Sequence, residues 1–389
     1  QIWVFERLQP GTGAYLIYNH LLLEGPLDIE ALEAACVVVI QRHDMLRTGF
    51  SERAGEPVQT VVERVDFSIP VIDLSSLPEA ERNAAMRREI DDDFARPFDL
   101  SRPPLMRVAI IRLAPERHVW LLSTHHIMSD AWSVMMIETE ITQCYNAILS
   151  GKPPELPEKA LQYGDVVLWQ TEPVQQQRIS RQIEFWRDAL SGASGLLDLP
   201  TDHPRPAVLS PRGARHEFLL TPEFNAQISE LARAENSTMF VVLLSAFQAL
   251  LARYSGDADI VVVTPVASRR LAELEPLIGL FVNTTALRGD LSGDPSSREL
   301  FARNRNHVLS ALENAEAPLE RVLEHLNIER APGRTPLFQT MFVLQNKAQG
   351  GAPRMQGLKQ TWVDPQIETA RFELTLSLAE TPRGLLCFI

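Results

Sequence analysis

The sequence predicts a mixed α/β protein of two lobes, and three observations support this fold class. The chain has 389 residues, which is enough for two domains that each bury a core. In both halves, strand-like apolar runs alternate with segments whose apolar residues recur at helical spacing. Residues 150–161 are polar and contain three prolines, which is typical of a domain boundary. The predicted domains are therefore residues 1–155 and 156–389.

The first half predicts strands with helices between them. Strands are expected over residues 14–23, 59–72 and, as a hairpin with a polar tip, 107–124. Helices are expected over residues 28–42, with Asp28 as the cap, 79–94 and 132–149. Gly151, Pro153 and Pro154 end the last helix. Residues 97–104 are expected to form an extended connector that leads into the hairpin.

The second half repeats the same mixture of elements, without a visible sequence repeat. Helices are expected over residues 175–190, 222–235, 238–254, 297–314 and 318–326. Strands are expected over residues 214–220, 260–267, 281–287, 338–344 and 372–378. Residues 350–351 and their flanks predict a flexible loop.

Composition narrows the class of protein. A formal net charge of −13 argues against a nucleic-acid binder, whose binding face would be basic. Cys36, Cys144 and Cys387 lie inside apolar runs without the spacing of a disulfide framework or a metal site, so we expect buried thiols in a reducing compartment. The chain has no uninterrupted run of about 18 apolar residues and no signal peptide at its start, so the default expectation is a cytoplasmic protein.

The stretch S-T-H-H-I-M-S-D-A-W-S, residues 123–133, contains the candidate site. Side chains alternate across a strand, so His125 and His126 should point to opposite faces of the predicted sheet. One histidine can then enter a cavity while the other packs in the scaffold. A histidine that faces a dry cavity can take a proton from an amine or a hydroxyl nucleophile. The residues alone equally allow two buried structural histidines.

Asp130 lies four residues beyond His126, where the chain turns into the predicted helix. Its carboxylate can hold an arginine, orient the loop, or simply cap the helix. Arg42 and Arg47 lie where another helix gives way to a strand, and either can make a buried bidentate pair or remain at the surface. A metal site is disfavoured, because His-His-x3-Asp offers at most three ligands and no Cys or His cluster lies nearby.

Five motifs together resemble the condensation domains of nonribosomal peptide synthetases, which are relatives of chloramphenicol acetyltransferase. The stretch H-H-I-M-S-D-A-W-S is similar to the family's HHxxxDGxS signature. The other four matches are R-H-D-M-L-R-T-G-F (residues 42–50), Y-G-D-V-V-L-W (163–169), I-G-L-F-V-N-T-T-A-L-R (278–288) and R-T-P-L-F-Q-T-M-F-V-L-Q-N (334–346). They follow the family's order and span almost the whole chain.

The resemblance implies two similar subdomains arranged as a V, with a tunnel between them. It implies amide-bond formation, in which an upstream acyl or peptidyl thioester on a carrier domain is attacked by the amine of a downstream aminoacyl thioester. Both substrates would be presented on 4′-phosphopantetheine arms, and the domain itself would bind no cofactor. The implied partners are two peptidyl carrier domains and an adjacent adenylation domain in a larger multidomain chain.

The resemblance also assigns roles to residues. His126 would lie in the middle of the tunnel, as a base or as a donor to the tetrahedral oxyanion, beside His125, Asp130 and Ser133. The family has a structural salt bridge in the region of Arg42 and Arg47, and we favour Arg47 as the partner of Asp130. Trp132 would line the tunnel. Backbone N–H groups near the start of the predicted helix would help the oxyanion.

Two positions leave alternatives open. Ala131 stands where the family usually has glycine, so either its φ is negative and the change is harmless, or the added methyl narrows the tunnel. Asn283 follows the turn at Ile278-Gly279, and its amide can bind a substrate amide or a pantetheine arm, or tie down a crossover loop.

Other functions on the same fold must be weighed. An epimerization domain shares the His-His motif, but residues 42–50 and 334–346 match condensation domains better. A cyclization domain would have Asp in place of both histidines. A non-catalytic domain that recruits partner enzymes usually lacks the second histidine, and here His126 is present. Gln1-Ile-Trp resembles the middle of the family's opening motif and the chain stops within an apparent strand, so we expect a fragment that is truncated at its end.

Overall fold

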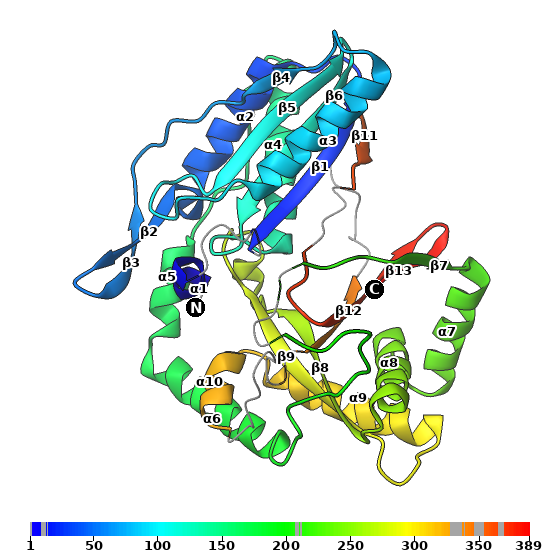
Figure 1. The fold of residues 1–389 in the computed structure, drawn as a ribbon. Helices are drawn as coiled ribbons and strands as arrows, with labels where there is room; N and C mark the ends of the chain where they lie inside the picture. The colour runs from blue at the N-terminus through cyan, green and yellow to red at the C-terminus, as the bar shows by residue number, and fades with distance from the viewer. Residues whose placement is uncertain are drawn as a thin grey trace. The chain divides into compact units, whose positions relative to one another are not determined.

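The computed structural model describes residues 2–8, 13, 15–206, 210, 212–326, 337, 339–345, 354–364 and 369–389 (Figure 1). Its contacts divide the chain into two compact units. Unit 1 comprises Gln1–Gln170, Arg269–Phe281 and Gly350–Gln366, and unit 2 comprises the remainder. The sequence predicted a single division after residue 155, whereas two segments of the second half cluster with unit 1. Both units mix helices with sheet, as predicted.

A five-stranded sheet forms the centre of unit 1, in the order β11-β1-β6-β5-β4. Its strands are β1 (Leu16–Glu24), β4 (Val71–Asp73), β5 (Met106–Ala114), β6 (Arg117–His125) and β11 (Lys359–Trp362). The predicted hairpin is confirmed, because β5 and β6 pair antiparallel along their length. Strand β6 also pairs with β1, so it is a central strand whose last residue is His125.

Helices cover both faces of this sheet (Figure 1). On one face, α2 (Ile29–Arg42) and α4 (Ala131–Leu149) share a core with Trp120 and Leu122 of β6. On the other face, Ile90 of α3 (Glu79–Ala95) packs with Val119 and Leu121. Every residue of β6 after Arg117 is therefore buried. This two-sided burial fixes the register of the strand that ends at the paired histidines.

Several short elements of unit 1 differ from the prediction. The strand expected over residues 59–72 is wrong, because β3 (Glu56–Val61) ends early and β4 begins only at Val71. The sequence also missed β2 (Thr48–Arg53), which pairs with β3 through a two-residue turn at Ala54 and Gly55. Both turn residues have positive φ, 53° and 85°, as a tight hairpin turn requires. Also unpredicted are α1 (Ile2–Leu8), a 3-10 turn (Asp44–Arg47) and α5 (Tyr163–Gln170).

Unit 2 is built on a six-stranded sheet in the order β7-β13-β12-β10-β8-β9. Its strands are β7 (Glu217–Leu220), β8 (Asp259–Ala267), β9 (Val282–Asp290), β10 (Thr340–Gln345), β12 (Leu374–Thr381) and β13 (Gly384–Phe388). Its helices are α6 (Pro173–Ala189), α7 (Pro222–Ala234), α8 (Met239–Ser255), α9 (Ser297–Glu313) and α10 (Leu319–Glu324). The elements predicted for the second half are present, with ends that shift by at most three residues. Residues 350–351, Gln1, residues 334–336, Phe338 and Asn346 lie outside the described residues.

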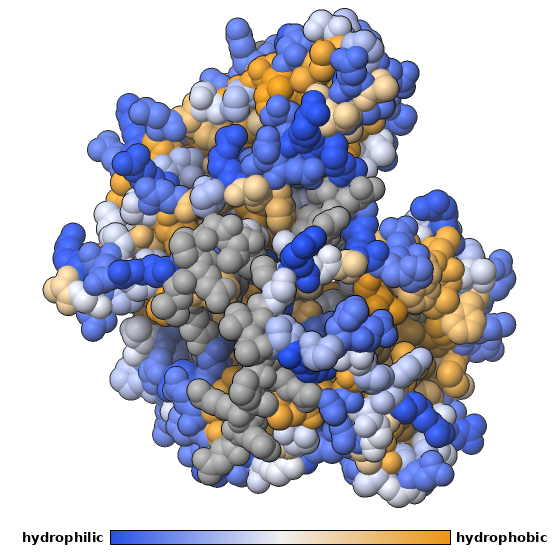
Figure 2. All heavy atoms as spheres, viewed as in Figure 1, coloured by the Kyte–Doolittle hydropathy of each residue, from blue (hydrophilic) through white to orange (hydrophobic). Residues whose placement is uncertain are grey.

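Apolar side chains are mostly interior, with local exceptions. The three cysteines are free and buried, as predicted. Phe224 and Leu231 of α7 are exposed. Figure 2 shows a hydrophobic, orange area at the right, where α7 lies in Figure 1. Within the described residues, no single helix is long and apolar enough to cross a membrane. The consecutive helices α7 and α8 pass that test only as a pair, and the pair bends by 102°.

Candidate functional site

The candidate site lies at the end of β6 and the start of α4, all within unit 1. The last strand residue, His125, is held by a hydrogen bond from its backbone N–H to the carbonyl of Leu105. The next N–H, of His126, donates to the carbonyl of Tyr15. The chain then turns, because Met128 N–H and the Ser129 hydroxyl both donate to the carbonyl of His125. The loop is therefore tied to the strands on both sides of it.

His125 is a scaffold residue. Its side chain is buried against Phe98, whose ring centroid lies 6.0 Å away, and against Tyr15 at 6.5 Å. Its Nδ1 accepts a hydrogen bond from the backbone N–H of Ile127 at 3.1 Å, so the proton of the neutral ring is on Nε2. That Nε2 lies 3.6 Å from a carboxylate oxygen of Glu6 in α1. Both ring nitrogens thus have structural neighbours.

His126 is held differently and is less buried than His125. Its Nδ1 lies 2.8 Å from the carbonyl oxygen of Ser129. A carbonyl can only accept, so Nδ1 carries the proton and Nε2 has the basic lone pair of the neutral ring. The two histidines therefore have opposite tautomers, which is consistent with the prediction that they have different roles.

Asp130 combines two of the roles considered for it, cap and ion pair. It is the N-cap of α4, where its Oδ1 accepts from the N–H of Ser133 at 2.8 Å. Its Oδ2 accepts from the N–H of Phe281 at 3.0 Å. The side chain is 4% exposed and pairs with the guanidinium of Arg269, which is 3% exposed, at 3.3 Å. Because its Oδ1 occupies the N–H of Ser133, that backbone donor is not available to an oxyanion.

The prediction that Arg47 or Arg42 pairs with Asp130 is wrong. Arg47 is bound to Asp44 at 2.6 Å, and Arg42 lies 3.3 Å from Glu140. Arg269 was missed because it lies 139 positions along the chain from Asp130, in a stretch with no regular pattern. Only the return of residues 269–281 to unit 1 brings the two charges together.

Arg269–Phe281, which we call the strap, is fixed to the start of α4 by Ser133. The Ser133 hydroxyl donates to the carbonyl of Gly279 at 2.8 Å and accepts from the N–H of Gly279 at 3.2 Å. It also accepts from Arg269 at 2.8 Å. A side chain at Gly279 has no room, since a Cβ there would lie 2.0 Å from the ring of Tyr163. Ser133 is therefore fully engaged in binding the strap.

Ala131 and Trp132 begin helix α4. Ala131 is the first helical residue, is exposed and is not among the described residues with positive φ. The branch of the prediction with negative φ is therefore confirmed, and Ala131 is not strained. Trp132 is 39% exposed, and its Nε1 donates to the carbonyl of Glu275 in the strap at 3.0 Å.

A buried polar cluster that the sequence did not indicate lies further along α4. His43 Nε2 is 2.7 Å from Glu140 Oε2, and Nδ1 of the same ring is 3.0 Å from Nζ of Lys159. Burial lowers the pKa of His43, although the hydrogen bond and the negative charge of Glu140 act to raise it. Burial likewise lowers the pKa of Lys159 to about 8. Burial opposes the ionisation of Glu140, but its bond to His43 and the nearby positive charges outweigh that effect, so its pKa is lowered.

Asn283, in unit 2, ties down a connecting loop, which is one of the two roles considered for it. Its side-chain amide donates to the carbonyls of Ala315 and Ala317, both at 2.8 Å, and its Oδ1 accepts from the N–H of Thr284. The amide donors that a substrate would need are occupied by the connection between α9 and α10.

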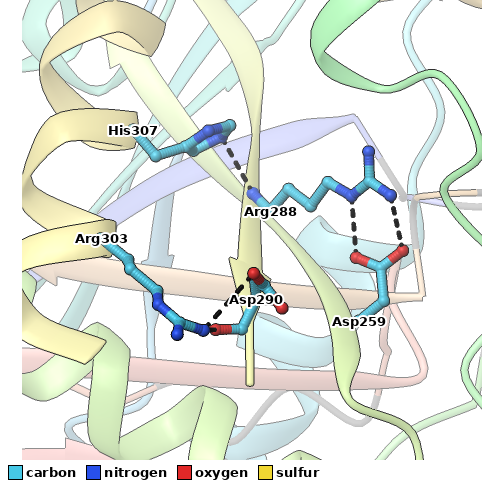
Figure 3. A pocket seen from close by; sticks show the side chains of 5 residues that line it. All are labelled: Asp259, Arg288, Asp290, Arg303 and His307. Atoms are coloured by element: carbon cyan, nitrogen blue, oxygen red, sulfur yellow. Dashed lines mark hydrogen bonds and ion pairs between the residues drawn. The ribbon is translucent and has the colours of Figure 1, made fainter. Parts of the chain in front are cut away.

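A surface cavity of about 540 Å³ in unit 2 is lined by Asp259, Arg288, Asp290, Arg303 and His307 (Figure 3). The Arg288 guanidinium makes a bidentate pair with Asp259 at 2.8 and 2.9 Å. Arg303 lies 3.4 Å from the carboxylate of Asp290. The two cations are matched by two carboxylates, and these ion pairs join β9 to β8 and to α9.

The fold and the loop define a class of protein, one in which a central strand ends at a histidine, a second histidine follows directly, and an aspartate-capped helix comes next. The family model described as "Condensation domain" matches residues 1–389. The chain belongs to the condensation domain family of nonribosomal peptide synthetases. Among the described residues, no group of three or more His, Cys, Asp or Glu side chains is arranged to hold a metal ion.

Known proteins resemble this chain in both sequence and fold. It is 42% identical over 387 residues to a component of the linear gramicidin synthase from Brevibacillus parabrevis, across 99% of this chain and 8% of that protein. The chain thus matches a small part of a large multidomain synthetase. The complex of the X-domain and OxyB from teicoplanin biosynthesis has a similar fold, with a TM-score of 0.87 and 26% identity over 100% of this chain and 85% of that one. The first condensation domain of the calcium-dependent antibiotic synthetase, with a substrate analogue, shares the fold at a TM-score of 0.77 and 20% identity over 100% of this chain and 87% of that one.

Proposed function

We propose that this chain catalyses amide-bond formation between an acyl or peptidyl thioester on an upstream carrier and the amine of an aminoacyl thioester on a downstream carrier. The observation that carries the proposal is the tautomer of His126. Its Nδ1–H is directed at the Ser129 carbonyl, so Nε2 is the nitrogen that accepts protons. Hydrogen bonds tie the loop to the adjoining strands and orient that ring, as acid–base chemistry requires.

In the proposed reaction, the amine nitrogen attacks the thioester carbon. The C–N bond forms, the C–S bond breaks, and the pantetheine sulfur leaves as a thiolate. His126 Nε2 takes the proton lost by the amine and returns it to the sulfur. Alternatively, protonated His126 donates to the oxyanion of the tetrahedral intermediate. Because a thioester is already activated, positioning the two tethered reactants is the main contribution, and proximity alone can supply several kcal/mol.

The remaining site residues support His126 without touching substrate in this proposal. His125 fixes the strand end, and the carboxylate of Asp130 fixes the start of α4 to Arg269. Ser133 holds Gly279, and Trp132 holds Glu275. We further propose the V-shaped arrangement and the tunnel that the family resemblance implies, with substrates on 4′-phosphopantetheine arms and no cofactor bound by the domain. The proposed neighbours are two carrier domains and an adenylation domain.

The test is a condensation assay with loaded upstream and downstream carrier domains, in which intact-mass spectrometry detects the dipeptidyl product. Wild-type protein should transfer the acyl group to the downstream carrier. The His126→Ala variant should fold and lose at least about a hundredfold in rate, the lower end of what general acid–base catalysis contributes. The same change at His203, which is exposed, is the matched control. A rate for His126→Ala within about threefold of wild type, under about 1 kcal/mol of barrier, would exclude the proposed role.

One observation favours a second candidate function. The X-domain structure that resembles this chain is a complex with OxyB, so this second function is the binding of a partner protein without turnover. If it holds, wild-type protein gives no dipeptidyl product with any loaded carrier pair and instead retains OxyB in a pull-down. Turnover that depends on His126 would exclude it.

A further inference from the structure

The strap, Arg269–Phe281, is held by side chains along four successive carbonyl groups. Arg269 Nη1 donates to the carbonyls of Leu274 and Leu277, both at 2.7 Å. Between them, the carbonyl of Glu275 accepts from Trp132 and the carbonyl of Pro276 accepts from Nζ of Lys159. Peptide carbonyls in a connecting segment are usually satisfied by backbone or water, so four carbonyls in a row with side-chain donors indicate a segment whose position is specified.

Lys159 differs from the other donors, because its Nζ is itself anchored in the buried cluster. An ammonium group can only donate, so its contact with His43 Nδ1 requires that nitrogen to be unprotonated. The proton of the ring is then on Nε2, which donates to Glu140 Oε2 at 2.7 Å. Each hydrogen bond in the cluster thus has one possible donor: Lys159 donates to His43, and His43 donates to Glu140. The strap is therefore connected to a charged group on α4.

The contact between Lys159 and the carbonyl of Pro276 is close in sequence to the carbonyls that bind Arg269, the partner of Asp130. Pro276 lies between the two residues whose carbonyls bind Arg269 Nη1. The other amino group of the same guanidinium, Nη2, reaches Asp130 and Ser133. Because the guanidinium is planar and rigid, a shift of the turn at Pro276 would displace Arg269 relative to Asp130, the residue that caps α4.

Placing a lysine in this position is costly, which argues that its contacts matter. Burial opposes the charged form, and this is why the pKa of Lys159 falls to about 8 in spite of the nearby carboxylate of Glu140. Arg42, which lies 3.3 Å from the same carboxylate, already supplies Glu140 with a positive charge. Lys159 is thus not needed to neutralise Glu140, whereas its ammonium is the donor that satisfies the carbonyl of Pro276.

We propose that Lys159 is a positioning residue for the condensation site, and that it holds the strap so that Arg269 stays on Asp130 and Ser133. The proposal rests on the condensation function proposed above. It predicts that the strap loosens when the ammonium is removed, even though every residue that contacts Asp130 is intact. It further predicts a loss in the chemical step rather than in carrier binding.

The first experiment measures hydrogen exchange by mass spectrometry in the free protein, so it does not depend on activity. The variant is Lys159→Met, which keeps an unbranched side chain only one heavy atom shorter and removes its donors. The reporters are the N–H groups of Gly279 and Phe281, which are bonded to Ser133 and Asp130. Peptides that cover them should exchange at least about tenfold faster, while peptides of β6 stay at the wild-type rate. The matched control is Lys152→Met, because Lys152 is exposed.

The second experiment measures condensation kinetics. Lys159→Met should lower kcat at least about tenfold and leave KM for the loaded carriers within about twofold, because an interaction outside the carrier contacts is lost. Lys159→Arg should restore strap protection and most of kcat, since a guanidinium can donate to both Pro276 and His43. If the methionine variant does not fold, Lys159→Gln replaces it, because an amide keeps the polarity but not the charge or the reach.

The outcomes separate the two proposals. Wild-type strap protection in Lys159→Met, faster exchange spread equally over unit 1, or a folded Lys159→Arg that restores nothing would each overturn the role of Lys159. If wild-type protein gives no dipeptidyl product, the condensation function fails, and the exchange measurement still decides whether Lys159 holds the strap.

Discussion

The pair formed by Asp130 and Arg269 gives the sharpest test of the structure, because it replaces a pairing that the sequence had suggested. The Asp130→Ala variant removes a helix cap, at a cost of about 1 kcal/mol. It also leaves the guanidinium of Arg269, 3% exposed, without its carboxylate, and breaking such a buried pair costs about 3–5 kcal/mol. We expect a combined loss of about 4–6 kcal/mol, a large share of a typical stability of about 5–15 kcal/mol.

The Arg269→Met variant should cost less, about 3 kcal/mol, because the stranded carboxylate of Asp130 keeps the N–H groups of Ser133 and Phe281. The double variant cannot lose the same ion pair twice. Its loss should therefore fall short of the sum by at least about 1 kcal/mol, within the range measured for residues in contact. The assay is urea unfolding of the four proteins, followed by tryptophan emission and circular dichroism at one pH.

Arg47 provides the control cycle. Its guanidinium is bound to Asp44 and to the carbonyl of Val62, so Arg47→Met should add to Asp130→Ala within about 0.5 kcal/mol. Strict additivity between Asp130 and Arg269, or coupling between Asp130 and Arg47, would refute the ion pair described above.

Three further predictions concern single positions. Neither ring nitrogen of His20 has a hydrogen-bond partner among the described residues, and burial lowers its pKa from 6.5 to about 4. Between these two pH values the unfolded chain therefore binds more protons than the folded one, and the free energy of unfolding falls by about 3 kcal/mol as the pH drops from 6.5 to 4. Urea titrations of His20→Leu should lack that part of the loss. The exposed control His203→Leu should keep it. Ala131→Gly should change the melting temperature little and not raise it, because φ is already negative; a clear rise would contradict the helical start. Gly279→Ala should cost about 1–3 kcal/mol through the ring of Tyr163, and Tyr163→Leu should recover part of it; a neutral Gly279→Ala would show that the strap has room.

The sequence by itself determined those features that depend on local pattern. The β5–β6 hairpin could be predicted because apolar runs flank a polar tip, and the ends of α4 followed from Asp130 at its start and Gly151 beyond its end. The different hydrogen-bonding of His125 and His126 is consistent with the side-chain alternation expected at the end of one strand. The motifs in chain order indicated the family. Each of these signals lies within a few residues or repeats with a fixed period.

Only the tertiary structure decided which distant residues meet. Arg269 rather than Arg47 pairs with Asp130, because the strap returns to unit 1 across 139 positions of chain. The contact of Lys159 with His43 likewise spans 116 positions and has no local pattern. The amide of Asn283 suited a substrate or a loop equally well in the sequence, and the carbonyls of Ala315 and Ala317 settled which it binds. The chemical groups of a side chain can be read from the sequence. Its partner depends on tertiary packing and on the need to pair buried charges, and these do not follow a fixed spacing in the sequence.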